Sequence, residues 1–507
     1  MSILIGLDVG TTNTKAIAFA AESGRVVAES SHPTPYVTVE VPPDGKPARE
    51  IDPETLWQAV VACLRDLSPH LNEPVRGIGI ASMAEAGVPL DAAGRPLGRI
   101  IPWNDPRTLP QLSEVLAEVG QDHLYEITGQ AQRFVYSLFK LLWIRQHAPD
   151  VHAQLHRWLS VADYVAYRLT GAAATDLSLA SRTMLFDQRE KRWSPELLRI
   201  AGLREDQLPT PLPAGTAVGE VSPTAAGRTG LAAGITVAIG GHDHLCGALA
   251  AGANRPGKVA DSIGTAESIV VPVPAFADDL RFAHRRICCY HYVVPGLFAV
   301  QAGLANAGGG LEWIASQTFG DAPNPVAAAL AAAARVAPGA DGLLYFPYLG
   351  GNGAPIGDEN ISGCFLGLRP THGRGQLVRA VLEGIAFGIR HGLETVSNVI
   401  GVTEPPISIF GGGSRSPLWR QLRADVLGQP VQSVEVVEAV ALGAALLAGV
   451  AAGVFPSAVT AAEAVERKPI LYLPNPAAQN RYEDIFRNIY VEIYPSLAPL
   501  FARIARL

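Results

Sequence analysis

The stretch from Gly240 to His244 has the residue types of a catalytic turn. It follows residues 234–239, a β-branched run that predicts a buried strand, and precedes small residues that predict the start of a helix. Asp243 is the one acid in this turn, and two glycines would let a ligand approach the backbone closely. We therefore expect Asp243 to meet a ligand. The alternative is that it only caps the following helix.

A second polar turn lies between residues 3–7 and 16–20, two apolar runs that predict the strands of a hairpin. The turn from Asp8 to Lys15 contains one acid, one glycine, three threonines and a lysine. Hydroxyls and exposed backbone amides suit phosphate oxygens, and Asp8 suits a hydrated magnesium ion. The alternative is an ordinary polar hairpin turn.

The second half of the chain echoes this turn, because residues 258–260 lead into a similar sequence, Asp261 to Thr265. One such hairpin in each of two domains would clamp a nucleotide between two lobes. Residues 407–410 predict a strand that ends in three glycines, Gly411 to Gly413. Glycines at a junction between strand and helix would let a base or phosphate lie against the backbone.

Trp103, Asp105 and Arg107 follow another predicted strand closely. The indole would cover the apolar face of a small polyhydroxylated ligand, and the charged groups would bind its hydroxyls. Taken singly, Trp103 is more often a core residue, and Asp105 and Arg107 are more often a surface pair.

Composition restricts the class of protein. The chain has 507 residues, which favours more than one domain, and its 48% hydrophobic and 17% charged residues supply a large core. A formal charge of −7 argues against a nucleic-acid-binding surface. Five cysteines without a CxxC pair, and an N-terminus without a basic n-region, favour a reduced cytoplasmic protein. The uncharged run from Ala439 past Phe455 predicts a buried helix, with a membrane span as the minor alternative.

Together these residues resemble the FGGY family of carbohydrate kinases, from residue 3 to about residue 454. The most specific likeness is residues 363–368 followed, after seven residues, by 376–383, which resemble the family's C-terminal signature. Residues 137–143 around Lys140 resemble its N-terminal signature, and Val135 departs from the usual residue type there.

The resemblance implies an α/β, two-lobed, actin-like (ribonuclease-H-like) ATPase fold with a nucleotide and sugar cleft between the lobes. Residues 1–246 would form the N-terminal lobe, with the sugar site and catalytic base, and residues 247–507 the nucleotide-binding C-terminal lobe. Asp243 would be the base and Asp8 the magnesium ligand. The ATP contacts that it implies are Thr11, Thr12, Lys15, Thr265, Gly308, Glu312, Gly412, Gly413 and Ser416.

The substrate residues implied are Glu85, Trp103, Asp105, Arg107 and His244. Glu85 lies where xylulokinases have a histidine and glycerol kinases a glutamate, and His244 replaces the family's common amide. A carboxylate only accepts hydrogen bonds, so Glu85 favours neutral substrates. We expect ATP- and Mg²⁺-dependent phosphorylation of a ketopentose such as xylulose. The alternatives are a polyol (erythritol, glycerol), a sugar acid (gluconate) and, remotely, a non-catalytic actin-like ATPase. No nucleic-acid or membrane partner is expected, and a homodimer is left open.

Overall fold

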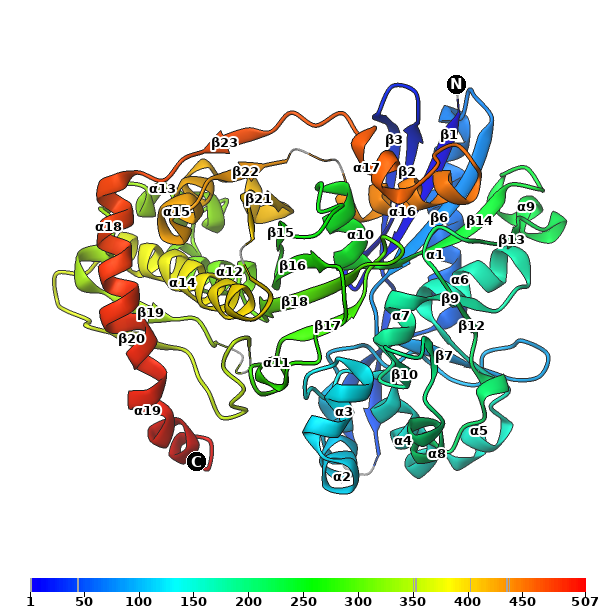
Figure 1. The fold of residues 1–507 in the computed structure, drawn as a ribbon, viewed down its shortest axis with the longest axis horizontal. Coiled ribbons are helices and arrows are strands. Elements are labelled where there is room, and N and C mark those ends of the chain that lie inside the picture. The colour runs from blue at the N-terminus through cyan, green and yellow to red at the C-terminus, as the bar shows by residue number, and fades with distance from the viewer. Residues whose placement is uncertain are drawn as a thin grey trace.

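Two mixed β-sheets, one in each lobe, form the framework of the computed structural model (Figure 1). The structure describes residues 2–42, 45–349, 351, 353–401, 403–434, 436 and 438–507. The strands of the first sheet, in spatial order, are β13 (Ala217–Glu220), β14 (Thr236–His242), β6 (Val75–Ser82), β1 (Ile3–Val9), β2 (Asn13–Ala20) and β3 (Arg25–Pro33). Those of the second are β17 (Cys288–His291), β18 (Phe298–Leu304), β16 (Glu267–Val273), β15 (Lys258–Ile263), β21 (Glu404–Phe410), β22 (Val431–Ser433) and β23 (Ile470–Tyr472).

The two sheets share one topology. In the first, β1 pairs antiparallel with β2 and parallel with β6, while β2 pairs antiparallel with β3 and β6 parallel with β14. In the second, β15 pairs antiparallel with β16 and parallel with β21, while β16 pairs antiparallel with β18 and β21 parallel with β22. Each lobe therefore begins with a hairpin followed by parallel strands, as the sequence echo between Asp8 and Asp261 predicted.

Helices cover both faces of the first sheet because its side chains alternate between them. Ile5 and Leu7 pack toward α1 (Pro53–Leu67) and α6 (Val161–Thr170), whereas Leu4 packs toward α10 (Asp243–Ala250) and α16 (Ala439–Ala451). The α16 backbone lies directly on the sheet: a Cβ at Gly6 would lie 1.8 Å from the Ala441 carbonyl oxygen. A C-terminal helix thus completes the N-terminal lobe, and Figure 1 shows it beside β1 and β2.

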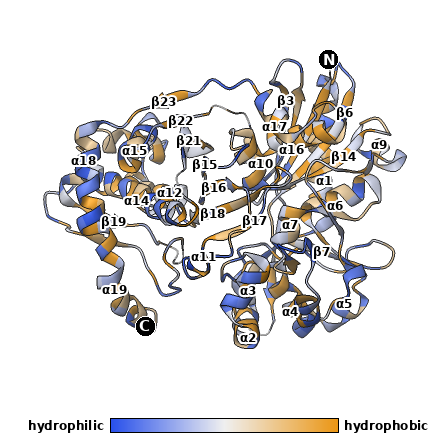
Figure 2. Cartoon of the chain, viewed as in Figure 1, coloured by the Kyte–Doolittle hydropathy of each residue, from blue (hydrophilic) through white to orange (hydrophobic). Residues whose placement is uncertain are grey.

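The second sheet packs mainly against α14 (Arg374–Ile400) and α15 (Pro417–Leu427). Beyond them lie α18 (Pro476–Ile485) and α19 (Val491–Ile504), and α12 (Gly308–Phe319) packs beside α14. Figure 2 shows hydrophobic residues concentrated on the central strands, with hydrophilic residues along the outer helices.

Local residues account for the start of α1, and the buried helix predicted after Ala439 is confirmed. Helix α1 begins at Pro53, and Asp52 caps it by accepting a hydrogen bond from the Thr55 backbone N–H at 2.8 Å. The uncharged run after Ala439 forms the buried helix α16, which has 13 residues. Among the residues that the structure describes, no helix has both the length and the apolar character needed to cross a membrane.

Candidate active site

Three acidic residues gather at one edge of the first sheet. Strands β1 and β14 both run parallel to β6, and Asp8 and Gly241 are both paired with Ala81. Glu85 follows the end of β6, and Asp243 is the first residue of α10 directly after β14. The carboxyl ends of parallel strands are where α/β sheets bind ligands, so the register alone brings Asp8, Glu85 and Asp243 to a ligand-binding edge.

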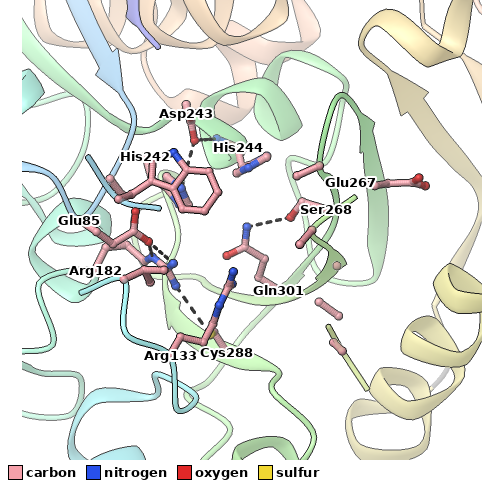
Figure 3. Close-up of a pocket in the computed structure, with 18 of the residues that line it drawn as sticks. Glu85, Arg133, Arg182, His242, Asp243, His244, Glu267, Ser268, Cys288 and Gln301 are labelled. Atoms are coloured by element: carbon pink, nitrogen blue, oxygen red, sulfur yellow. Dashed lines mark hydrogen bonds and ion pairs between the residues drawn. The ribbon is translucent and has the colours of Figure 1, made fainter. Parts of the chain in front are cut away.

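A cavity of about 180 Å³ lies between the lobes at this edge (Figure 3). Both lobes contribute polar and charged side chains to its wall. Those of the first lobe are Thr11, Glu85, Trp103, Arg133, Arg182, His242, Asp243 and His244, and those of the second are Glu267, Ser268, Arg286, Cys288 and Gln301.

Asp243 does not act as the helix cap. His242 is the N-cap residue of α10, and its side chain makes no capping hydrogen bond. Asp243 Oδ1 accepts a hydrogen bond from the His244 backbone N–H at 2.6 Å and lies 3.1 Å from His242 Nε2. Burial opposes ionisation, but His244 and His242 outweigh it and lower the pKa of Asp243 to about 2. Asp243 is therefore an ionised carboxylate in the cavity wall.

Glu85 forms a buried ion pair that the sequence did not predict. The Arg182 guanidinium contacts Glu85 Oε1 through Nε at 2.7 Å and also through Nη2, and its Nη1 donates to Gln130 Oε1 at 2.7 Å. The exposed fractions of the two side chains are 7% for Glu85 and 4% for Arg182. Glu85 has a φ of +64°, a left-handed conformation that is strained for a residue with a Cβ. The pair is neutral overall, so Glu85 does not give the cavity a negative charge.

Two more arginines line the cavity. Arg286 is paired with Glu359. Arg133 is half-buried and extends toward Gln301 in Figure 3. Within the described residues Arg133 has no hydrogen bond or ion pair to another side chain, so its positive charge is available to a ligand.

The chemistry of Asp8 fits a divalent cation. Its Oδ1 atom is buried and has no hydrogen-bond partner among the described residues. Burial, and then the nearby Asp243 carboxylate, raise the pKa of Asp8 to about 8. A bound cation would satisfy the orphaned oxygen and offset the repulsion. Lys15, which is paired with Asp8 in the hairpin register, is bonded through Nζ to Glu438 Oε2 at 2.6 Å, an interaction between the hairpin and the start of α16.

The structure separates the predicted substrate cluster. Trp103 lines the Asp243 cavity, and its Nε1 donates to Thr11 Oγ1 at 3.0 Å. Arg107 is paired with Asp105 at 2.8 Å and with Glu50 at 2.6 Å, and these side chains are mostly buried. Asp105 and Arg107 line a second cavity of about 1260 Å³ rather than that of Asp243. Asp105 and Arg107 are therefore paired with each other, as the alternative expected, but the pair is buried and not on the surface.

The predicted nucleotide residues of the second lobe converge beyond β15. The Thr265 carbonyl accepts a hydrogen bond from the Gly309 N–H at 3.1 Å, and a Cβ at Gly308 would lie 2.3 Å from the Gly264 oxygen. Gly413 is close to the end of β15, because a Cβ there would lie 2.3 Å from Ile263 Cγ2.

The remaining members of this predicted set differ in exposure. A Cβ added at Gly412 would have no other atom within 4 Å. Glu312 is exposed, and so is Thr12 of the first lobe. Ser416 caps α15 by accepting a hydrogen bond from the Trp419 N–H at 3.3 Å.

Comparison with known families agrees with this architecture. Residues 3–250 match the N-terminal domain of the FGGY family of carbohydrate kinases, and residues 262–452 match its C-terminal domain. The chain belongs to the FGGY family of carbohydrate kinases. It is therefore an enzyme, a phosphotransferase acting on a carbohydrate, with the two-lobed actin-like ATPase fold and with ATP as the family's phosphate donor.

Individual relatives act on different sugars. The chain is 31% identical over 497 residues to the xylulose kinase of Bacillus subtilis (strain 168), covering 97% of each chain. It is 28% identical over 520 residues to the gluconokinase of the same organism, covering 100% of this chain and 96% of the relative. The crystal structure of xylulose kinase from Rhodospirillum rubrum matches with a TM-score of 0.89 and 32% identity, covering 99% of this chain and 100% of that one.

Sequence reasoning missed several residues that complete the site, most of them far from Asp243 in the chain. They are Arg133, Arg182, His242 as a partner of the base, Tyr290, Gln301 and Glu438. The histidine directly before Asp243 was visible as an adjacent titratable group, and it is the one signal that could have been used. The others depend on which strands and helices meet in space.

Proposed function

We propose that this FGGY kinase transfers the γ-phosphate of ATP to a hydroxyl of a small sugar, with a ketopentose such as xylulose as the leading substrate. The observation that carries the proposal is the ionised Asp243 at the carboxyl edge of the first sheet, in the wall of a cavity between the lobes. Relatives named as xylulose kinases, at about 31% identity over nearly the whole chain, support the choice of sugar.

Asp243 would orient the acceptor hydroxyl toward the γ-phosphorus. Both contacts of its carboxylate with the described residues use Oδ1, which leaves Oδ2 to accept the substrate O–H. In a loose phosphoryl-transfer transition state the hydroxyl loses its proton late, so positioning matters more than basicity. A pKa of about 2 is compatible with that role, because the carboxylate is ionised and ready to accept a hydrogen bond at neutral pH.

Asp8 would hold Mg²⁺, which supplies charge stabilisation on the phosphate oxygens when it is bound. The hydroxyls and amides of the Thr11–Thr12 turn would orient the transferring phosphate. Lys15 would reach it on leaving Glu438. The walls from both lobes would exclude water and so limit wasteful hydrolysis of ATP.

A coupled ADP-release assay on a panel of acceptors tests the proposal. Xylulose, ribulose, erythritol, glycerol and gluconate are compared at identical ATP and Mg²⁺, and we expect xylulose or ribulose to give the highest kcat/KM. Release of ADP that is independent of every acceptor would favour the non-catalytic ATPase instead.

A sugar acid is the second candidate, and Arg133 is the observation that favours it. Glu85 was expected to repel a substrate carboxylate, but Arg182 neutralises it, whereas Arg133 has no acidic partner among the described residues. If gluconate is a substrate, Arg133→Gln should raise its KM roughly 10- to 100-fold, the range for losing a charged hydrogen bond. Arg199→Gln, on an exposed surface pair with Glu118, is the matched control and should leave that KM unchanged.

The cellular setting is part of the same proposal. We infer a cytoplasmic enzyme from its cysteine usage and its small-molecule substrates. Light scattering would measure whether it forms a homodimer.

A further inference from the structure

His242, directly before the base, is fixed on three sides. Its ring is buried, with Nε2 3.1 Å from Asp243 Oδ1 and Nδ1 2.9 Å from the Tyr290 hydroxyl. Its backbone N–H donates to Ser178 Oγ at 2.9 Å. The imidazole therefore bridges the base in the first lobe and a tyrosine on β17 of the second.

The bridge continues through the second sheet. The Tyr290 hydroxyl donates to Gln301 Oε1 at 2.7 Å, and Gln301 Nε2 donates to Ser268 Oγ at 2.8 Å. These three residues lie on β17, β18 and β16, which are neighbours in the sheet. Figure 3 shows Gln301 and Ser268 on the side of the cavity opposite His242 and Asp243. An unbroken series of polar contacts thus joins Asp243 to the C-terminal lobe.

The protons on His242 follow from the direction of the bond between Tyr290 and Gln301. A tyrosine hydroxyl has one hydrogen; with that hydrogen directed to Gln301 Oε1, the hydroxyl accepts from His242 Nδ1–H. The contact between Nε2 and the Asp243 carboxylate then requires a proton on Nε2 as well. In this arrangement both ring nitrogens carry a proton, and the imidazolium is paired with the Asp243 carboxylate.

Other titratable groups lie close to the ring. His244, on α10, has its ring centroid 5.4 Å from that of His242 and donates its backbone N–H to Asp243. Asp176, at the start of α7 (Leu177–Ser181), uses its carboxylate to accept from the N–H groups of Ser178 and Leu179. On the far side, the Arg182 guanidinium carbon lies 5.4 Å from the centre of the Tyr290 ring and is paired with Glu85.

We propose that His242 is a positioning residue for the base, and that Tyr290 ties it to the second lobe. The imidazolium holds Asp243 through Oδ1, which leaves Oδ2 for the acceptor hydroxyl, and the series from Tyr290 to Ser268 sets this geometry when the lobes are together. The catalytic consequence of this inference rests on the proposed kinase function. The ion pair between His242 and Asp243 does not depend on that function.

Kinetics on the full chain test the catalytic consequence, with the best acceptor of the panel. His242→Ala should lower kcat by roughly 10- to 100-fold, the scale of a misplaced reacting group, with the KM for ATP within twofold of wild type. His242→Gln keeps one donor toward Asp243 and should recover part of the loss. Tyr290→Phe should lower kcat in the same direction by a smaller factor.

Tyr292→Phe is the matched control. Tyr292 is equally buried two residues away, but its hydroxyl donates to the Ala253 carbonyl at 2.6 Å and does not contact the site. Its kcat should equal that of wild type. A kcat of His242→Ala within twofold of wild type, or equal losses in Tyr290→Phe and Tyr292→Phe, would overturn the positioning role.

A spectroscopic measurement separates this inference from the kinase proposal. In protein labelled with ¹⁵N-histidine, both ring nitrogens of His242 should have imidazolium shifts at pH 7, identified by their loss in His242→Gln. They should become those of a neutral ring in Asp243→Asn. A neutral His242 in wild type would refute the ion pair, whichever sugar the enzyme accepts.

Discussion

The buried pair of Glu85 and Arg182 should dominate the effect of changing Glu85. Removal of one partner leaves a buried charge without compensation, at about 3–5 kcal/mol. The exposed fractions of 7% and 4%, together with the hydrogen bond from Arg182 to Gln130, place this pair in that class. We expect Glu85→Ala to lower the free energy of unfolding by about 3–5 kcal/mol. Its effect on sugar binding would follow from the disturbed cavity wall.

The left-handed backbone at Glu85 supplies an internal comparison. Glycine tolerates a φ of +64° without the cost that a Cβ brings, so Glu85→Gly should be more stable than Glu85→Ala by roughly 1 kcal/mol. The double variant Glu85→Gln with Arg182→Gln removes both charges and should recover much of the loss. Urea unfolding followed by tryptophan fluorescence measures all three.

A change below about 1 kcal/mol in Glu85→Ala would refute the reasoning, since that is the range of exposed pairs. Strict additivity in the double variant would refute it too. Either result, combined with a raised sugar KM, would mean that the Glu85 carboxylate faces the sugar, as the sequence alone suggested.

Four further variants test other parts of the protein. Asp243→Asn should lower turnover by at least ~10²-fold while ATP affinity by calorimetry stays near wild type, and near-native turnover would remove Asp243 as the base. Gly412→Val should weaken ATP binding at unchanged stability, whereas Gly413→Val should lower the stability of the protein because its Cβ would overlap Ile263. If Gly412→Val keeps its ATP affinity, this loop is not part of the nucleotide site. Burial lowers the pKa of Lys140 from 10.5 to about 7, so the unfolded chain binds the extra proton between these values. Wild type should therefore gain up to about 1.4 kcal/mol of stability per pH unit over Lys140→Met in that window, and parallel stability curves would contradict it.

The sequence predicted the parts of the fold that local pattern determines. The apolar runs around Asp8 and the strand before Asp243 each depend on neighbouring residues, and both are present. The repeat at Asp261 was a weak signal alone, but the matching strand pairings of the two sheets support it.

The interactions of the side chains that line the cavity depend on partners far away in the sequence. Glu85 and Arg182 are 97 positions apart, and His242 and Tyr290 are 48 apart, so no spacing rule joins them. The charge of the site changes with these pairs, because Arg182 cancels a carboxylate on which the preference for neutral sugars was based. A Cβ at Gly413 would meet Ile263, a packing constraint that the sequence did not show, and the contact of Gly413 with the nucleotide stays a prediction.

The packing of α16 against the first sheet limits how the lobes can move. Because this helix belongs to the N-terminal lobe in space, the chain passes between the lobes at residues 251–257, again before Ala439, and a third time before β23. A hinge rotation must bend all three connections together, and Glu438, which holds Lys15, lies on the second. In the proposed function, binding of phosphate at Lys15 would release that tether and would link nucleotide binding to the freedom of the hinge. Neither half of the chain is a free-standing unit.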